Sequence, residues 1–288
     1  MLYLQALING ILMGGIYAVM ALGLSLIFGV LNIINLAHGN LMVIGMYLSY
    51  LLFVLLGIDP YLSLIAIASF LFLIGYMIQR LILNPILDAP EEMSVLITLG
   101  LGMIIQNVLL MAFGPDYFTV DTSYKLNSLM LMGLSIDVTK TFAFGASLIM
   151  TGVFFSFLQW TELGRAIRAA SNNREAAMLA GINVKKIYCI AFAIGTATVA
   201  AAGSCVSTFI PTSQGAGILF TMTSFVVVII GGVGNYLGAL AGGFLIGIVE
   251  ELGAVLLSGS MKQVVSFGLL IIILLLKPEG LLGRKGEE

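Results

Sequence analysis

Charged residues are scarce in this sequence, because Asp, Glu, Lys and Arg together make up 9% of its 288 residues. A soluble globular chain contains about 25%. So few charges cannot cover a water-facing surface of this size, and 60% of the residues are apolar. The composition therefore predicts a membrane protein whose surface is covered mostly by lipid. A basic stripe that would bind nucleic acid is also lacking.

Cysteine and histidine are rarer still. Cys189 and Cys205 lie sixteen residues apart in one apolar stretch, a spacing that suits neither a metal site nor a short disulfide loop. We interpret them as buried thiols. With one histidine, no paired metal ligands and no nucleophile motif, the sequence contains no plausible catalytic constellation. We therefore expect no catalytic residue, metal or cofactor in this chain, and we discount a membrane-embedded enzyme.

Two further absences concern the chain's organisation. The segment MLYLQALING contains no Lys or Arg before its apolar run, so we expect the first helix to be retained rather than cleaved as a signal peptide. The sequence also contains no soluble domain and no P-loop. Any ATP chemistry must then come from another subunit.

Long apolar stretches are what the sequence has in quantity. A membrane-spanning helix needs roughly 20 mostly apolar residues. The candidate stretches are 7–28, 36–56, 62–82, 93–113, 141–159, 187–210, 219–232, 236–257 and 262–276. We predict an all-α fold, a single transmembrane domain over residues 1–288. It is a polytopic helical bundle of about eight to ten membrane segments, some of them broken or re-entrant.

The distribution of Lys and Arg predicts the orientation. They gather in segment 160–186 and in the C-terminal tail, both predicted to be cytoplasmic, whereas 114–140 is rich in Asp and is predicted to lie outside. Nine spans would place the N-terminus outside as well. The basic residues are Arg165, Arg168, Arg174, Lys185 and Lys186 in the segment and Lys277, Arg284 and Lys285 in the tail.

A short helix is predicted inside the basic segment, which reads GRAIRAASNNREAAMLAGINV over 164–184. Asn173 is a good N-cap, Glu175 suits the first turn and Gly181 suits the residue that ends the helix. We predict a capped helix of about seven residues over 174–180, roughly 10 Å long. Ser171 and Asn172 are assigned to its start.

The exposed face of this helix is predicted to be small and apolar, and it consists of Ala176, Ala177, Leu179 and Ala180. A helix this short is not stable alone in water, so it must pack against something. Two alternatives stay open: it folds back on its own bundle, or it inserts into a groove of a partner protein.

A family resemblance rests on this segment and on several others. The motif REAAMLAG resembles the EAA loop of ABC importer permeases, whose short coupling helix docks on an ATPase subunit. Almost the whole chain is similar to the branched-chain amino acid permease family, and it is closer to the LivH than to the LivM type. The matching motifs include NGILMGGIYAVMALGLSLIFGVLNIINLAHGNLMVIGMYLSY, LITLGLGMIIQNVLLMAFGPD, GGVGNYLGALAGG and KPEGLLG.

The resemblance implies a multi-pass permease subunit of the inner membrane that moves branched-chain or other apolar amino acids by alternating access. The implied partners are a second permease subunit (LivM-like or a second copy), two ATPase subunits that hold ATP and Mg, and an extracytoplasmic substrate-binding protein. The residues assigned to ATPase coupling are Arg165, Arg174, Glu175, Ala176, Ala177, Leu179 and Gly181.

Some positions depart from the family pattern. Asn40 stands where Asp is common, Glu251 follows Glu250 where one acid is usual, and the loop around Arg80 has few arginines. These departures leave the substrate open, with urea, short amides or another small solute as alternatives.

Polar side chains inside predicted spans are the candidates for the translocation pathway, because unsatisfied polar groups cost several kcal/mol each in hydrocarbon. Asn32, Asn35, His38 and Asn40 form either a re-entrant segment along the pathway or a packed cluster, and His38 alone is better read as a core histidine. Gln106 and Asn107 are interpreted first as partners in hydrogen bonds between helices.

Glu250 and Glu251 are adjacent carboxylates within a predicted span. A charge near the membrane midplane costs at least roughly 2.5–3.5 kcal/mol, so a partner or a role is expected. Glu250 is a further pathway candidate, and proton coupling through the pair would define an alternative class, an ion-coupled secondary transporter. We favour a carboxylate that is hydrogen-bonded across a helix interface or placed near the mouth of the pathway.

Glycines recur four residues apart at Gly10 and Gly14 and again at Gly238 and Gly242. Small residues at this spacing let two helices approach closely in lipid. We predict helix packing at both places, and a helix break just before Tyr236.

Overall fold

The computed structural model describes residues 1–87, 89–125, 127–131 and 133–283. The helices are α1 Leu2–Leu31, α2 His38–Leu56, α3 Pro60–Ile78, α4 Glu91–Phe113, α5 Val138–Trp160, α6 Glu162–Asn172, α7 Arg174–Leu179, α8 Val184–Val206, α9 Gly217–Gly231, α10 Tyr236–Leu256 and α11 Lys262–Leu276. Short π or 3₁₀ segments occur at Gln79–Leu83, Asn84–Ile86, Gln214–Ala216 and Gly259–Met261. A two-stranded antiparallel hairpin pairs β1 Ser128–Leu131 with β2 Leu134–Asp137.

The predicted all-α membrane bundle is confirmed. Within the described residues, eight helices are long and apolar enough to cross a membrane, and α11 is a ninth, shorter apolar helix of 15 residues. The stretch predicted at 36–56 starts as a helix only at His38, after a non-helical segment that begins at Asn32. The break before Tyr236 is present too, with Gly232 and Gly234 at φ of 102° and 72°.

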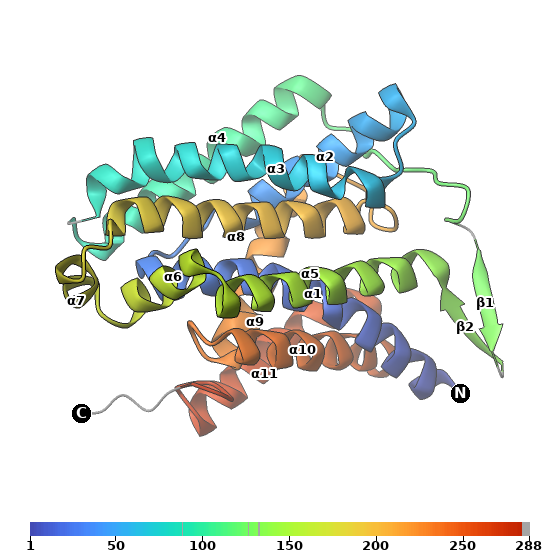
Figure 1. The fold of residues 1–288 in the computed structure, drawn as a ribbon. Helices are drawn as coiled ribbons and strands as arrows, with labels where there is room; N and C mark the ends of the chain where they lie inside the picture. The colour runs from blue at the N-terminus through green and yellow to red at the C-terminus, as the bar shows by residue number, and fades with distance from the viewer. Residues whose placement is uncertain (88, 126, 132, 284–288) are drawn as a thin grey trace.

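The bundle has two ends, which Figure 1 shows at the left and the right. Helices α6 and α7 lie at one end, called here the α7 end, and the β1–β2 hairpin and the N-terminus lie at the other, called the hairpin end. The described C-terminal tail belongs to the α7 end, because Leu281 N donates to Ile230 O at the end of α9 (2.7 Å). Arg284 and Lys285, counted in predicting the orientation, lie outside the described residues.

The two halves of the chain pack in a related way. Helix α1 makes its most extensive contacts with α10, and α3 makes its most extensive contacts with α8. The four helices α1–α4 can be matched in order with α8–α11, so that α1 corresponds to α8 and α3 to α10. The α1–α10 contact then corresponds to the α8–α3 contact, and the α2–α3 contact corresponds to the α9–α10 contact. Because α1 and α8 run in opposite directions (Figure 1), the arrangement is that of an inverted repeat, which is common in transporters.

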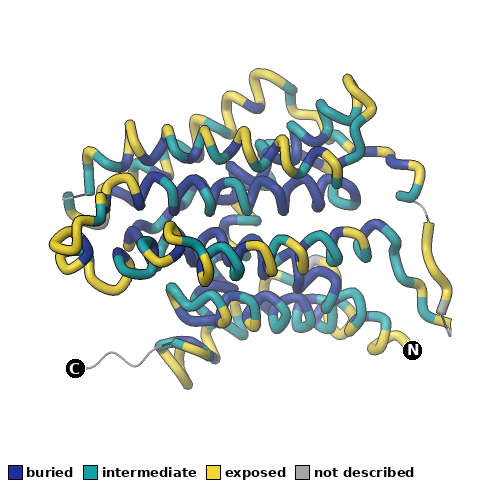
Figure 2. The backbone as a smooth tube through the Cα atoms, viewed as in Figure 1, coloured by how far each residue is buried: buried dark blue, intermediate teal, exposed yellow. Residues whose placement is uncertain are grey.

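Helices α1 and α8 form the centre of the bundle and cross at two glycines. A Cβ on Gly23 would lie 2.7 Å from Gly195 O, and one on Gly195 would lie 2.6 Å from Gly23 O. The predicted packing of Gly10 is confirmed as well, because a Cβ there would lie 2.6 Å from the Cα of Ile248 in α10. Figure 2 shows the burial that results, concentrated on α8 and the inner helices. Cys189 and Cys205 are free, buried thiols, as predicted.

Candidate functional site

The basic segment between α5 and α8 folds as two short helices rather than one (Figure 1). Thr161 caps α6 through its hydroxyl, which accepts from Gly164 N at 2.9 Å. Asn173 caps α7, as predicted, and accepts from Ala176 N at 2.9 Å. Gly181 follows α7 with φ of 82°, a conformation that suits glycine at a helix end.

Two details of the prediction for this segment are wrong. Ser171 and Asn172 end α6 instead of starting α7. Ala177 does not belong to the exposed face, because its side chain is 4% exposed and packs into the bundle core. The signal for α6 was present in the sequence, since Gly164, Ile167 and Ala170 recur three residues apart and form its buried face.

The outward surface of α7 is small and mostly apolar. Leu179 is 90% exposed and Met178 48%. Glu175, Ala176 and Ala180 are exposed as well. The helix is therefore held to the bundle by one face while another apolar face is left uncovered.

The segment around α7 carries basic side chains, and it is hydrogen-bonded to α1 at the centre of the bundle. Arg165 pairs with Glu162 at 3.6 Å on the exposed side of α6. Ser171 donates to Gly29 O near the end of α1. A polar cavity of about 410 Å³ between these elements is lined by Asn32 and Arg174 among others, so the structure brings together two residues that were predicted for separate roles.

The polar residues before and within α2 lie where α2 and α9 begin. Asn32 ends α1, and its backbone has a left-handed conformation with φ of 53°. Asn35 and His38 are fully buried, and His38 Nε2 donates to Met20 O at 3.0 Å. Asn35 Oδ1 accepts from Ala37 N at 3.1 Å, and Asn40 is 8% exposed.

The beginnings of α2 and α9 are in direct contact. Gly39 N donates to Thr221 Oγ1 at 2.9 Å, and a Cβ on Gly39 would lie 2.0 Å from Gly217 O. A Cβ on Gly217 would meet Asn40 Oδ1 at 2.1 Å. These contacts describe a closely packed junction of two broken helices. A role for the junction in the translocation pathway stays a prediction.

Gln106 and Asn107 face outward from α4. Both side chains are exposed in this chain, and Asn107 Nδ2 donates to Met103 O of its own helix at 2.8 Å. The preferred interpretation, a hydrogen bond from Asn107 to another helix, is therefore not what the structure shows. Two amides on the outer face of an apolar helix are costly if that face meets lipid.

Glu250 lies between three helices and is 5% exposed. Tyr17 of α1 donates to its Oε2 at 2.7 Å, and Ser266 of α11 donates to its Oε1 at 2.6 Å. Glu251 forms an ion pair with Lys262. The geometry of Glu250 agrees with the interpretation favoured from the sequence, a carboxylate that is hydrogen-bonded across a helix interface.

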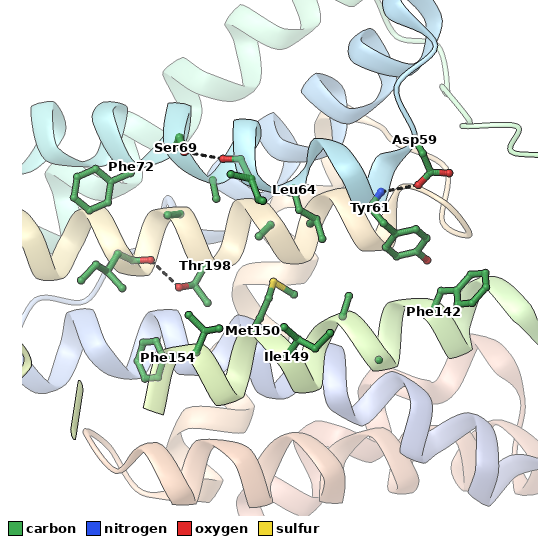
Figure 3. A pocket seen from close by; sticks show the side chains of 18 of the residues that line it. Asp59, Tyr61, Leu64, Ser69, Phe72, Phe142, Ile149, Met150, Phe154 and Thr198 are labelled. Carbon is green, nitrogen blue, oxygen red and sulfur yellow. Dashed lines mark hydrogen bonds between the residues drawn. The ribbon is translucent and has the colours of Figure 1, made fainter. Parts of the chain in front are cut away.

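A large apolar groove, which the sequence did not predict, lies between α3, α5 and α8. Its volume is about 1020 Å³. Figure 3 shows Leu64 and Phe72 of α3 on one side and Ile149 and Phe154 of α5 on the other. Its lining includes none of the predicted pathway residues Asn32, Asn35, His38, Asn40, Gln106, Asn107 or Glu250. We call it the α3–α5 groove.

One end of the α3–α5 groove is polar. Asp59 caps α3 by accepting from Tyr61 N at 2.9 Å, and its second oxygen accepts from the Tyr124 hydroxyl at 2.7 Å. Burial raises the pKa of Tyr124, and the hydrogen bond to Asp59 raises it further, so the phenol stays protonated and donates. The sequence contained no signal for this cluster, because Tyr124 is 65 residues from Asp59.

Comparison with known proteins gives a consistent result. Residues 6–274 match the family model described as branched-chain amino acid transport system / permease component. The chain is 30% identical to the high-affinity branched-chain amino acid transport system permease protein BraD of Pseudomonas aeruginosa, over 99% of this chain and 97% of that protein. LivH of Escherichia coli gives the same identity and coverage, and a probable LivH of Methanocaldococcus jannaschii is 28% identical over 96% and 91%. No solved structure matches.

Proposed function

Because the chain belongs to the family of permease components of branched-chain amino acid transport systems, we propose that it is the membrane-spanning subunit of an ATP-driven importer for branched-chain or other apolar amino acids. The relatives BraD and LivH, which the chain matches over nearly its full length, are themselves named as permeases of such systems. The chain is a transport subunit, and ATP and Mg are held by separate ATPase subunits.

The observation that carries this proposal is the uncovered apolar face of α7. A side chain such as Leu179, 90% exposed on a capped helix that is otherwise anchored, suits insertion into a groove of another protein. The flanking side chains Arg165, Glu175 and Ala176 are exposed with it. We assign α7 as the coupling helix on which an ATPase subunit docks.

Charge supports the orientation that this docking needs. Arg165, Lys185 and Lys186 are exposed at the α7 end, where positive charge indicates the cytoplasm. At the hairpin end, Asp116 and Asp121 are exposed. In this proposal the α7 end and the C-terminus are cytoplasmic, the protein is a multi-pass inner-membrane protein, and an external substrate-binding protein meets the hairpin end.

The outward amides of α4 suggest where a second permease subunit packs. Gln106 and Asn107 would be costly against lipid, and a second permease (LivM-like or a second copy) can supply hydrogen bonds to them. An interface on α4 would also place these two residues at the boundary between the subunits, where a shared pathway can form. The other pathway candidates stay proposals of the same kind.

The mechanism that follows is alternating access. Closure of the ATPase subunits moves α7, and the hydrogen bond from Ser171 to Gly29 O links the coupling segment to α1. Helix α1 spans 30 residues, about 45 Å, and packs closely on α8 and α10, so it moves with them as a body. The displacement then changes which side of the membrane the pathway between the permeases faces.

The experiment that tests this proposal is the substitution Leu179→Asp, which puts a charge on the exposed face of α7. We expect loss of co-purification with the ATPase subunit and at least a tenfold loss of ATP-driven leucine uptake. Leu129→Asp is the matched control, because Leu129 is also exposed (56%) but lies in the hairpin. This control should retain the ATPase. If Leu179→Asp keeps both ATPase binding and uptake, α7 is not the coupling helix.

A further inference from the structure

The walls of the α3–α5 groove present hydrocarbon to whatever occupies it. Most lining side chains are Leu, Ile, Val, Ala, Met or Phe. The hydroxyls in its middle are already used, because Ser69 donates to Ile65 O and Thr198 donates to Ile194 O, each at 2.7 Å. The middle of the groove therefore has few polar groups free to bind a polar solute.

The groove is long, and its opening lies on the outer surface of this chain. Residues from 141 to 157 of α5 line it, a helix length of about 24 Å. That exceeds one leaflet of a hydrocarbon core of about 30 Å. Ile65, Ile149 and Val153 on its rims are 80%, 70% and 64% exposed, so the opening is a surface that lipid reaches.

The polar end of the groove combines a carboxylate with aromatic rings. Tyr61, Tyr124 and Phe142 are in mutual contact, with centroid distances of 6.2 Å, 6.0 Å and 5.6 Å. Asp59 lies beside them and keeps a lone pair on each oxygen beyond its hydrogen bonds to Tyr61 and Tyr124. A carboxylate with aromatic faces favours a cationic ammonium group.

We propose that the α3–α5 groove binds a membrane lipid, with a hydrocarbon chain between α3 and α5 and an ammonium headgroup at Asp59, Tyr61 and Tyr124. The lining contains one acid and no Lys or Arg, so the carboxylate of a free amino acid would have no partner there. A small amino acid would also leave most of the groove empty. The acyl chain of a lipid is long enough to follow the groove, while the phosphate of the lipid stays in the interface outside it.

The first experiment measures lipid preference. The full-length protein is reconstituted in nanodiscs with equal amounts of phosphatidylethanolamine, phosphatidylcholine and phosphatidylglycerol of the same acyl chains, and the lipids retained after release are counted by native mass spectrometry. We expect phosphatidylethanolamine and phosphatidylcholine, whose headgroups carry an ammonium group, to be retained in preference to phosphatidylglycerol. The ratio of retained phosphatidylethanolamine to retained phosphatidylcholine then decides whether the site prefers a primary or a quaternary ammonium group. Equal retention of all three lipids would overturn the proposal.

Variants then locate the headgroup. Asp59→Asn keeps the N-cap of α3, because Asn also caps helices, but removes the charge. We expect the preference for ammonium lipids to fall roughly threefold to tenfold. Asp121→Asn is the control, since Asp121 is an exposed acid of the same region that pairs with Lys125 outside the groove. An unchanged preference in Asp59→Asn would show that Asp59 does not bind the headgroup.

A third pair of variants locates the chain. Gly145 lines the groove, and a Cβ there meets nothing within 4 Å, so Gly145→Leu fills space without forcing the helices apart. Gly152→Leu is matched, because Gly152 lies on the same helix with equal free space but is not part of the lining. We expect loss of the retained lipid in the first variant only. Equal retention of lipid by the Gly145→Leu and Gly152→Leu variants would contradict the placement of the hydrocarbon chain in the groove.

Wild-type protein gives a test that does not depend on any variant folding. Phosphatidylethanolamine with a photoreactive acyl chain should label groove residues such as Ile149 and Val153 in preference to exposed residues of α11 such as Leu275, which is 80% exposed and outside the groove. Labels spread evenly over α3, α5 and α11 would indicate ordinary contact with bulk lipid and would contradict a specific site.

Discussion

At the scale of single residues, Glu250 shows how a carboxylate is tolerated inside a spanning helix. Each of its oxygens accepts one short hydrogen bond, from Tyr17 and from Ser266, and the side chain is almost fully buried. Buried polar groups that are fully partnered hold neighbouring helices in one arrangement. Glu250 therefore ties α10 to α1 and α11, and this geometry favours a structural role over ion coupling.

Glu250→Gln tests that role. The amide oxygen still accepts one of the two hydrogen bonds and no charge remains, so we expect ATP-driven uptake within about twofold of wild type. Glu250→Ala leaves both hydroxyls without their acceptor and should lower the free energy of unfolding by about 1–3 kcal/mol. Uptake and thermal unfolding in detergent measure the two effects. Abolished uptake in a well-folded Glu250→Gln protein would instead support ion coupling.

At the scale of the helices, the crossing of α1 and α8 sets the centre of the bundle. Gly23 and Gly195 each approach the other's carbonyl oxygen so closely that a methyl group does not fit. The atoms in the way belong to backbone, which cannot turn aside as a flexible side chain can. Close backbone packing of this kind is how helices associate in lipid, where the hydrophobic effect does not drive them together.

Gly23→Ala should therefore force the two helices apart and lower the stability by about 1–3 kcal/mol. Gly100→Ala is the control, because a Cβ on Gly100 in α4 meets nothing within 4 Å. The control should be neutral or slightly stabilising, since alanine favours a helix over glycine. Thermal unfolding of the two variants in the same detergent makes the comparison. Equal midpoints would mean that the crossing tolerates a methyl group.

At the scale of the whole molecule, burial is uneven around the bundle. The α8 layer is mostly buried, whereas α4 exposes much of its surface (Figure 2). Gln106 and Asn107 are among the exposed residues of α4. The α3–α5 groove opens on another surface, lined almost entirely by hydrocarbon. We assign the α4 surface to the second permease and the groove to lipid, because amides need polar partners and hydrocarbon does not.

A photoreactive amino acid in place of Gln106 tests the assignment of α4. We expect it to cross-link to the second permease subunit in membranes. The same group in place of Leu62 should cross-link to lipid only, because Leu62 is 76% exposed on a different helix, α3. Gel shifts identified by mass spectrometry separate the products. Cross-linking from position 62 but not from position 106 would move the subunit interface to α3.

The features that depend on neighbouring residues could be predicted without any knowledge of the fold. Apolar runs of sufficient length define the spans, since a membrane requires every backbone polar group to be bonded within a helix. Asn173 and Gly181 define the ends of α7 for an equally local reason, because caps bond to backbone groups a few residues away. The motif around Glu175 and several others along the chain indicated the family, which the comparisons then confirmed.

The contacts between distant segments, in contrast, became evident only from the fold. Glu250 finds Tyr17 across 233 residues, α2 and α9 begin against each other, and three helices that are not consecutive form the α3–α5 groove. Ala177 turns inward and Gln106 outward although both stand in helices that the sequence located. In an apolar sequence nearly every face of a helix can face lipid or protein, so periodicity alone does not select the buried one.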